Sequence, residues 1–132
     1  MADAGVKSKR PLSPHLGVYR WTWTMAGSVL HRITGIALYG ASLFLVWYLV
    51  TLASGPTAFD DANAFFGSWF GQLILFGITF VLVLHAMGGI RHFVWNLGIG
   101  MGKRARDALA FGSVAGSVVI TILIWVAVFL AR

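Results

Sequence analysis

Three apolar runs, each long enough to cross a lipid bilayer, constrain this 132-residue chain more than any other feature. The core of the first run, residues 33–53, contains no charged residue. A transmembrane helix needs about 20 consecutive apolar residues, and inside lipid the backbone must satisfy its own hydrogen bonds. The sequence therefore predicts an all-α membrane protein with three transmembrane helices, at about 28–53, 68–94 and 108–131.

The composition supports a membrane protein and excludes several kinds of site. Hydrophobic residues make up 58% of the chain and charged residues only 11%, whereas soluble proteins carry about 25% charged residues. The chain has no cysteine, which excludes disulfides, thiolate metal sites and iron–sulfur ligation by its own residues. It has no glutamate and four aspartates, so neither a carboxylate-pair enzyme nor a carboxylate metal centre is expected.

The basic residues are concentrated in two regions, the N-terminal segment up to Arg32 and the stretch that follows the second span. Together these regions hold nine of the ten lysines and arginines. The positive-inside rule then places the N-terminus in the cytoplasm, or in the mitochondrial matrix, and the acidic loop up to residue 67 outside. Residues 1–27 are expected to form an irregular cytoplasmic or interfacial arm before a transmembrane domain at 28–132. Membrane topology explains the positive charge without nucleic acid.

His85 is an ionisable residue inside an apolar span, which marks a candidate functional site. At 1.5 Å per residue it lies roughly 9 Å inside Arg91. Its imidazole is either hydrogen-bonded to a serine or threonine of another helix or bound to haem iron as an axial ligand. Gly88, Gly89 and His92 share its helix face, so a flat macrocycle can lie on this bare strip with its propionates towards Arg91 and His92. This spacing favours the haem.

Only one of the four histidines lies deep in a predicted span. A haem with two histidine ligands would therefore lack its second ligand in this chain. We expect another subunit to supply it, so that the three-helix domain forms half of a heterodimeric haem-binding bundle.

A second group of polar residues lies at the start of the first span. Ser28 and Arg32 are four residues apart and face the same side of a helix, with His31 beside them. Arg32 alone is explained by a side chain that extends to the lipid headgroups. The alternative is a polar pocket at the membrane edge, where a hydroxyl and a cation bind the carbonyl of a lipid-soluble quinone.

The third span contains the pattern Gly112-x-x-x-Gly116, with Ser113 and Ser117 one residue further along. Small residues four apart let helices approach closely. Glycine is also common in membrane helices generally, so both interpretations stay open.

Three ordered segments resemble the signature segments of the succinate dehydrogenase cytochrome b subunit family, a membrane anchor of respiratory complex II. They are residues 10–19 (RPLSPHLGVY), residues 28–35 (SVLHRITG) and residues 85–95 (HAMGGIRHFVW). The segments occur in the family's order and, with the three-span layout, extend the resemblance over nearly the whole chain.

The resemblance implies a set of roles for these residues. His85 matches the axial ligand of haem b, which is shared with a second membrane anchor subunit. Ser28 and Arg32 match residues of the ubiquinone site, and His31 and His92 match positions near the haem propionates. A flavoprotein subunit oxidises succinate and an iron–sulfur subunit brings the electrons to the membrane, so this chain has no dehydrogenase activity alone.

One departure from the family pattern is Asn96, where the family usually has an aspartate. Asparagine can form hydrogen bonds but cannot titrate, so a protonic role at this position is in doubt. Two alternatives to the main hypothesis are an anchor of a quinol:fumarate reductase and a haem-free structural anchor. The short arm beginning Met-Ala-Asp favours the bacterial inner membrane over the mitochondrial inner membrane.

Overall fold

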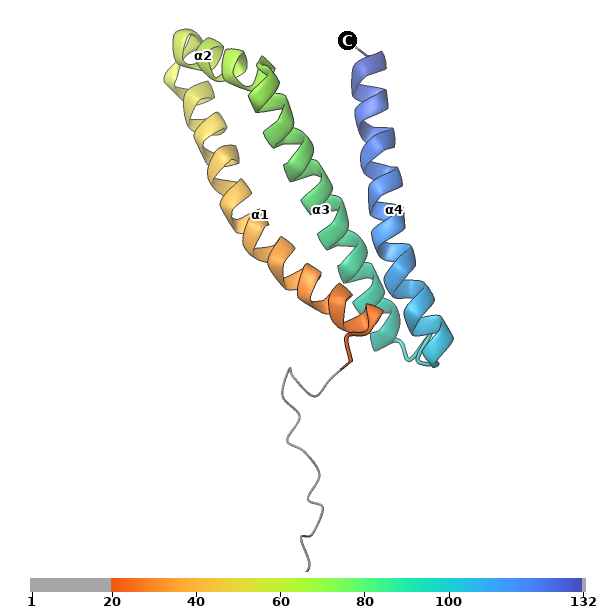
Figure 1. Cartoon of the computed structure of the whole chain (residues 1–132). Coiled ribbons are helices and arrows are strands. Elements are labelled where there is room, and N and C mark those ends of the chain that lie inside the picture. The colour runs from red at the N-terminus through yellow and green to blue at the C-terminus, as the bar shows by residue number, and fades with distance from the viewer. Residues whose placement is uncertain (1–19, 132) are drawn as a thin grey trace, which may run out of the picture.

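The computed structural model describes residues 20–131, which form four α-helices (Figure 1). They are α1 (Trp23–Ser54), α2 (Pro56–Gly67), α3 (Trp69–Asn96) and α4 (Lys103–Leu130). Helices α1, α3 and α4 are each long and apolar enough to cross a membrane, which confirms the predicted all-α fold with three spans. Most of the predicted arm, residues 1–19, lies outside the described residues.

The segment between the first two spans is a helix, and the prediction of a loop was wrong. Gly55 has φ of 110°, which glycine adopts without strain, and makes the sharp turn out of α1. Pro56 then occupies the first turn of α2, where its missing N–H is not needed. The ring of Phe66 lies 5.5 Å from Trp47 and 5.8 Å from Tyr48 of α1. This aromatic packing, which a search for apolar runs does not detect, holds α2 in place.

The turn from α2 into α3 is tight. The Ser68 hydroxyl donates to the Phe65 carbonyl at 2.6 Å and accepts from the backbone N–H of Gly71 at 3.1 Å. A Cβ at Gly71 would collide with the backbone of Phe65 and Phe66. Only glycine therefore lets α2 approach α3 so closely.

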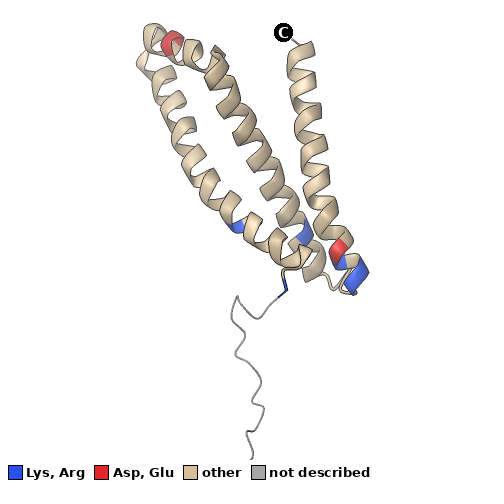
Figure 2. Ribbon diagram, viewed as in Figure 1, with Lys and Arg blue, Asp and Glu red and all other residues tan. Residues whose placement is uncertain are grey.

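Helices α1 and α3 lie close together at the end that holds Trp23 and Asn96 and diverge towards α2 (Figure 1). We call the convergent end of the bundle the inner half and the end under α2 the outer half. Lysines and arginines gather at the inner end, and α2 carries Asp60 and Asp61 at the other (Figure 2). The charge asymmetry read from the sequence is thus an asymmetry of the folded molecule.

Helix α4 packs through a buried face of small hydroxyl residues, Ser113, Ser117 and Thr121. Each hydroxyl donates to a backbone carbonyl of its own helix at 2.6 to 2.8 Å, so the face is buried without unpaired hydroxyl groups. A Cβ at Gly112 would meet open space, and one at Gly116 would only touch a side chain at 3.3 Å. The close-packing face lies one residue beyond the predicted glycine pair.

Candidate functional site

His85 lies in α3 with its ring turned towards α1. Its Nδ1 atom is 3.1 Å from the backbone carbonyl oxygen of His31 and 3.1 Å from Oγ1 of Thr34. The Thr34 hydroxyl donates to the same carbonyl at 3.0 Å. A carbonyl oxygen can only accept, so Nδ1 of His85 is the donor of this bond, and in the neutral imidazole Nε2 then keeps its lone pair. Within residues 20–131 no hydrogen bond occupies that lone pair.

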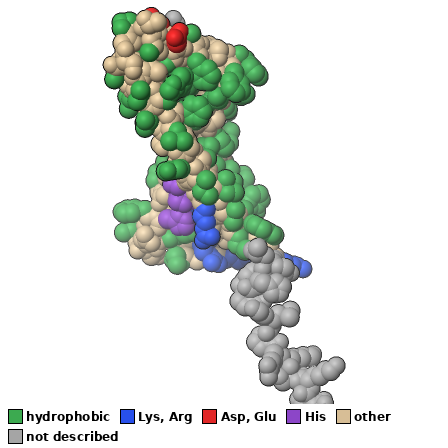
Figure 3. All heavy atoms as spheres, turned by 90° about the vertical axis from the view of Figure 1, so that its left-hand side faces the viewer, with side chains coloured by type: hydrophobic (Ala, Val, Ile, Leu, Met, Phe, Trp, Pro, Cys, Tyr) green, Lys and Arg blue, Asp and Glu red, His purple; other side chains and the backbone are tan. Residues whose placement is uncertain are grey.

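The structure brings three of the predicted site residues together. The His31 ring stacks on the His85 ring, with centroids 4.0 Å apart and planes 11° apart. His92 meets His31 edge-on at 5.3 Å, and Trp95 meets His92 at 5.4 Å. Figure 3 shows histidine and basic side chains side by side on this face of the molecule. The result is an imidazole cluster in the inner half, beside a positively charged surface.

Glycines make room for these rings. A Cβ at Gly35 would lie 3.3 Å from Cε1 of His85, and one at Gly88 would collide with the ring of His31. A Cβ at Gly89 would meet nothing within 4 Å. His31 therefore fills the space above Gly88, and of the two glycines expected to form a bare strip only Gly89 is open.

Arg91 lies in α3 and is buried where α1 and α4 pack against it. It is only 3% exposed, and its Nη1 donates to Ser113 Oγ of α4 at 3.4 Å. The guanidinium carbon lies 5.2 Å from the ring centre of Trp95, and a Cβ at Gly27 of α1 would collide with the guanidinium. Arg91 thus joins three helices, and its predicted place at the haem propionates stays a prediction.

Ser28 and Arg32 lie on α1 at the inner end, on the face where the sequence placed them. Arg32 is exposed and Ser28 is half-buried. Neither side chain forms a hydrogen bond within the described residues. Both side chains can therefore donate hydrogen bonds to a ligand. A closed pocket would need walls from another chain. The part of Ser28 and Arg32 in quinone binding stays a prediction.

Sequence reasoning missed four residues of the site: Gly27, Thr34, Gly35 and Ser113. The spacing held a signal for Thr34, which lies three residues after His31 on the same face of an apolar helix. Ser113 was noticed only beside the glycine pattern. Its contact with Arg91 depends on how α4 docks, which no local pattern encodes.

The described residues contain no group of three or more histidine, cysteine, aspartate or glutamate side chains that could hold a metal ion. One free imidazole nitrogen suits an iron whose other ligands come from a macrocycle and from a second protein chain.

Comparison with known proteins gives a consistent result. Residues 6–124 match the family of the succinate dehydrogenase/fumarate reductase transmembrane subunit. The chain is 36% identical over 129 residues to the succinate dehydrogenase cytochrome b556 subunit of Paracoccus denitrificans, covering 98% of both chains. It is 33% identical over 121 residues to the protein of that name from Rickettsia bellii, covering 92% of this chain and 94% of the relative.

A mitochondrial relative matches over a shorter stretch. The succinate dehydrogenase cytochrome b560 subunit of Sus scrofa is 41% identical over 108 residues, which are 71% of this chain and 57% of the relative. These matches confirm the resemblance that the three sequence segments carried. The chain belongs to the succinate dehydrogenase/fumarate reductase transmembrane subunit family, among the succinate dehydrogenase cytochrome b subunits.

Proposed function

We propose that this chain is the membrane anchor of succinate dehydrogenase that provides one axial ligand to haem b and part of the ubiquinone-reduction site. In this role it passes electrons from the iron–sulfur subunit to ubiquinone. The hydrogen bond from His85 Nδ1 to the His31 carbonyl carries the proposal, because it fixes the tautomer that leaves Nε2 free. The names of the relatives support succinate oxidation as the direction.

The surface beside His85 fits a haem. Leu82 and Phe93 are 54% and 65% exposed, Ala86 is exposed, and Gly89 has open space above it. By helical geometry these residues form one apolar strip next to His85. Haem b, when bound, supplies a one-electron redox centre within the membrane. A second protein ligand for the haem would come from the second membrane anchor subunit.

The protein holds the His85 ring in a defined orientation. Thr34 and the His31 carbonyl hold Nδ1, the His31 ring covers one face of the imidazole, and Gly35 lets α1 approach its edge. An imidazole supported in this way would keep its orientation and its basicity when it binds a metal. His92 and the basic residues of the inner end provide positive charge for the propionates.

Ser28 and Arg32 would bind the quinone head at the edge of the membrane. The Arg32 guanidinium and the Ser28 hydroxyl are donors, and neither forms a hydrogen bond with another residue of 20–131. A quinone oxygen accepts from such donors, while its tail stays in lipid. The inner end would face the cytoplasm of a bacterium, with the iron–sulfur and flavoprotein subunits on that side.

The haem proposal is tested by optical spectra of the intact purified complex, oxidised and reduced. We expect b-type bands in the wild type that His85→Ala weakens or shifts. Leu73→Ala, at an exposed position near the start of α3, should leave them unchanged. A wild-type complex without haem would overturn the proposal and favour a structural anchor, in which His85 only joins α3 to α1.

The quinone proposal has a separate test. Ser28→Ala and Arg32→Leu should each lower succinate:ubiquinone reductase activity, by about 10-fold or more for the charged donor. Succinate oxidation with an artificial acceptor that reacts at the hydrophilic subunits should be unchanged. Equal loss of both activities would instead indicate damaged assembly and contradict a direct role in quinone binding.

A further inference from the structure

A small cavity lies where α1, α3 and α4 meet. Its volume is about 10 Å³, and its lining includes Gly27, His31, Gly88, Arg91 and Ser113. Residues of all three helices line it, and Ser113 and Val114 form the part of its wall that α4 provides. At Gly27 and Gly88 the Arg91 guanidinium and the His31 ring lie so close to the backbone that a Cβ at either position would collide with them.

The polar groups at this junction are incompletely paired. Nε and Nη2 of Arg91 are buried without a hydrogen-bond partner among residues 20–131, and so is Nε2 of His31. Ser113 donates its own proton to a backbone carbonyl at 2.8 Å, so its oxygen can accept from Arg91. A buried guanidinium needs acceptors for its remaining N–H groups, since unpaired buried polar groups are strongly unfavourable.

We propose that one internal water molecule occupies this cavity, accepts from the Arg91 guanidinium and donates to Nε2 of His31. A cavity needs about 10–15 Å³ and two to four polar partners to hold one water. The junction has that volume, and Arg91, His31 and the Ser113 oxygen are its partners.

The water makes Arg91 a positioning residue. It links the α4 hydroxyl face through Arg91 to His31, and the His31 ring stacks at 4.0 Å on His85. Helix α4, which contributes no candidate ligand, thereby holds the ring that supports the ligand imidazole. This consequence for His85 rests on the proposed function, whereas the water site itself does not.

The direct test is an experimental structure of the intact complex that resolves ordered water. We expect a single water within hydrogen-bond distance of the Arg91 guanidinium and His31 Nε2. An empty cavity would overturn the proposal. So would a partner subunit, a haem propionate or a group from residues 1–19 bonded to Nε or Nη2 of Arg91.

Variants test the link from α4 to the site. Ser113→Val removes the acceptor and fills the cavity, and Gly27→Ala places a methyl group against the guanidinium. Gly112→Ala on α4 and Gly40→Ala on α1 are matched controls, because a Cβ at either position meets nothing within 4 Å. We expect the unfolding midpoint of the complex to fall by about 3 °C or more for the first pair and to stay unchanged for the controls. Equal midpoints in all four would contradict the link.

Two further readouts separate this proposal from the haem proposal. Arg91→Lys should retain more protein stability than Arg91→Met, because an ammonium can still form a hydrogen bond with the water. An equal loss of stability in both variants would contradict a water bound to Arg91. In a haem-containing complex, Ser113→Val should also shift the spectrum of the oxidised haem, and no shift would overturn the positioning role. If the complex contains no haem, the experimental structure and the unfolding midpoints of the variants still test whether the water links Arg91 to His31.

Discussion

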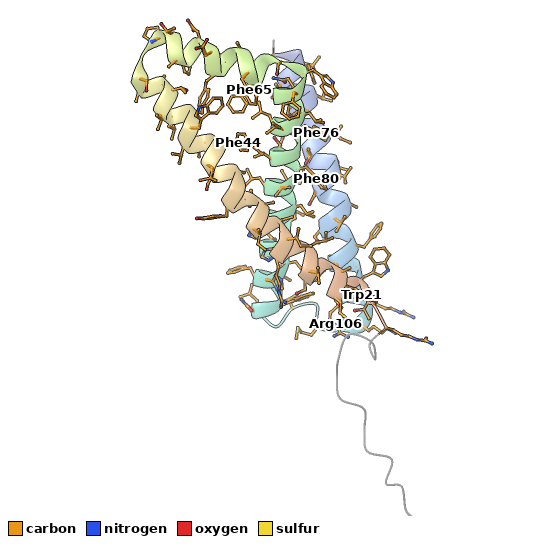
Figure 4. The ribbon with its side chains drawn as sticks, turned by 60° about the vertical axis from the view of Figure 1, so that its left-hand side comes forward. Trp21, Phe44, Phe65, Phe76, Phe80 and Arg106 are labelled. Atoms are coloured by element: carbon orange, nitrogen blue, oxygen red, sulfur yellow. The ribbon has the colours of Figure 1, made fainter. Side chains whose placement is uncertain are left out.

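The two halves of the bundle are built differently. In the inner half α1 and α3 converge, rings stack 4.0 Å apart, and hydrogen bonds join the helices. In the outer half α1 and α3 diverge around an apolar cavity of about 480 Å³ that α2 covers. Figure 4 shows Phe44 and Phe65 in this outer half, with Trp21 and Arg106 at the opposite end. Polar, closely fitted packing and open, apolar packing thus occur in one three-helix domain.

The difference follows from what each half must bury. Polar side chains inside a membrane need partners within the protein, so helices that carry them must come close. Glycines without Cβ atoms allow that approach at Gly27, Gly35 and Gly88. Gly40 and Gly77, further out, meet nothing within 4 Å. Replacing a glycine by alanine should therefore lower the stability of the protein more in the inner half than in the outer half, with one exception.

The exception is Gly71, which lies in the outer half but should not tolerate substitution. Gly71→Ala places a Cβ against the Phe65 carbonyl and the Phe66 Cα, which are backbone atoms that no rotamer change can move. We expect a loss of about 3 kcal/mol, at the upper end for overpacked sites, and the largest fall in the unfolding midpoint of the complex. Gly77→Ala on the same helix is the control. If the two variants have the same unfolding midpoint, the α2–α3 turn is not rigid.

The next largest effect tests the inner half at two adjacent glycines. Gly88→Ala drives a methyl group into the His31 ring, which cannot retreat because it is stacked on His85, and should cost about 1–3 kcal/mol. Gly89→Ala meets open space and should leave protein stability unchanged or slightly raised, since alanine favours helix. Thermal unfolding of the two complexes measures the contrast. A stable Gly88→Ala variant would show that the imidazole stack is loose.

Much of this architecture is encoded locally. Apolar run length predicts the three spans, and the deep His85 with Ser28, His31 and Arg32 predicts a candidate site in what the structure shows as the inner half. The depth of a histidine and the faces of a helix depend only on spacing, which the sequence states directly.

The parts that could not be predicted depend on contacts between distant segments. Helix α2 has no long apolar run and is held by rings of α1. From the sequence, Arg91 is interpreted as a charge at the membrane boundary, and only the packing of α4 brings it into contact with Ser113. Gly88 reads as an open surface until the angle between α1 and α3 brings His31 over it. These contacts are properties of the helix packing, and residue periodicity does not contain them.

The smallest effect compares one hydroxyl in each half. Thr34→Val removes a group bonded to His85 in the inner half, while Tyr48→Phe removes a bond of 3.2 Å to Asn63 Oδ1 at an exposed site in the outer half. Hydrogen bonds between membrane helices contribute about 0.6 kcal/mol on average and up to about 1.7. We expect Thr34→Val near the upper value, because it removes the Thr34 bonds to both His85 Nδ1 and the His31 carbonyl. We expect Tyr48→Phe at or below the average.

Spectra of the same complexes distinguish the two hydroxyls more sharply than stability does. Thr34→Val should shift the b-type bands if His85 is the ligand. Thr34→Ser should leave the bands at their wild-type positions, because the serine hydroxyl can reach the same atoms. Tyr48→Phe should leave the bands unchanged, since its ring stays packed on Phe59 and Phe66. A spectral shift from Tyr48→Phe would mean that the outer half also controls the ligand. The two halves would then act as one structural unit.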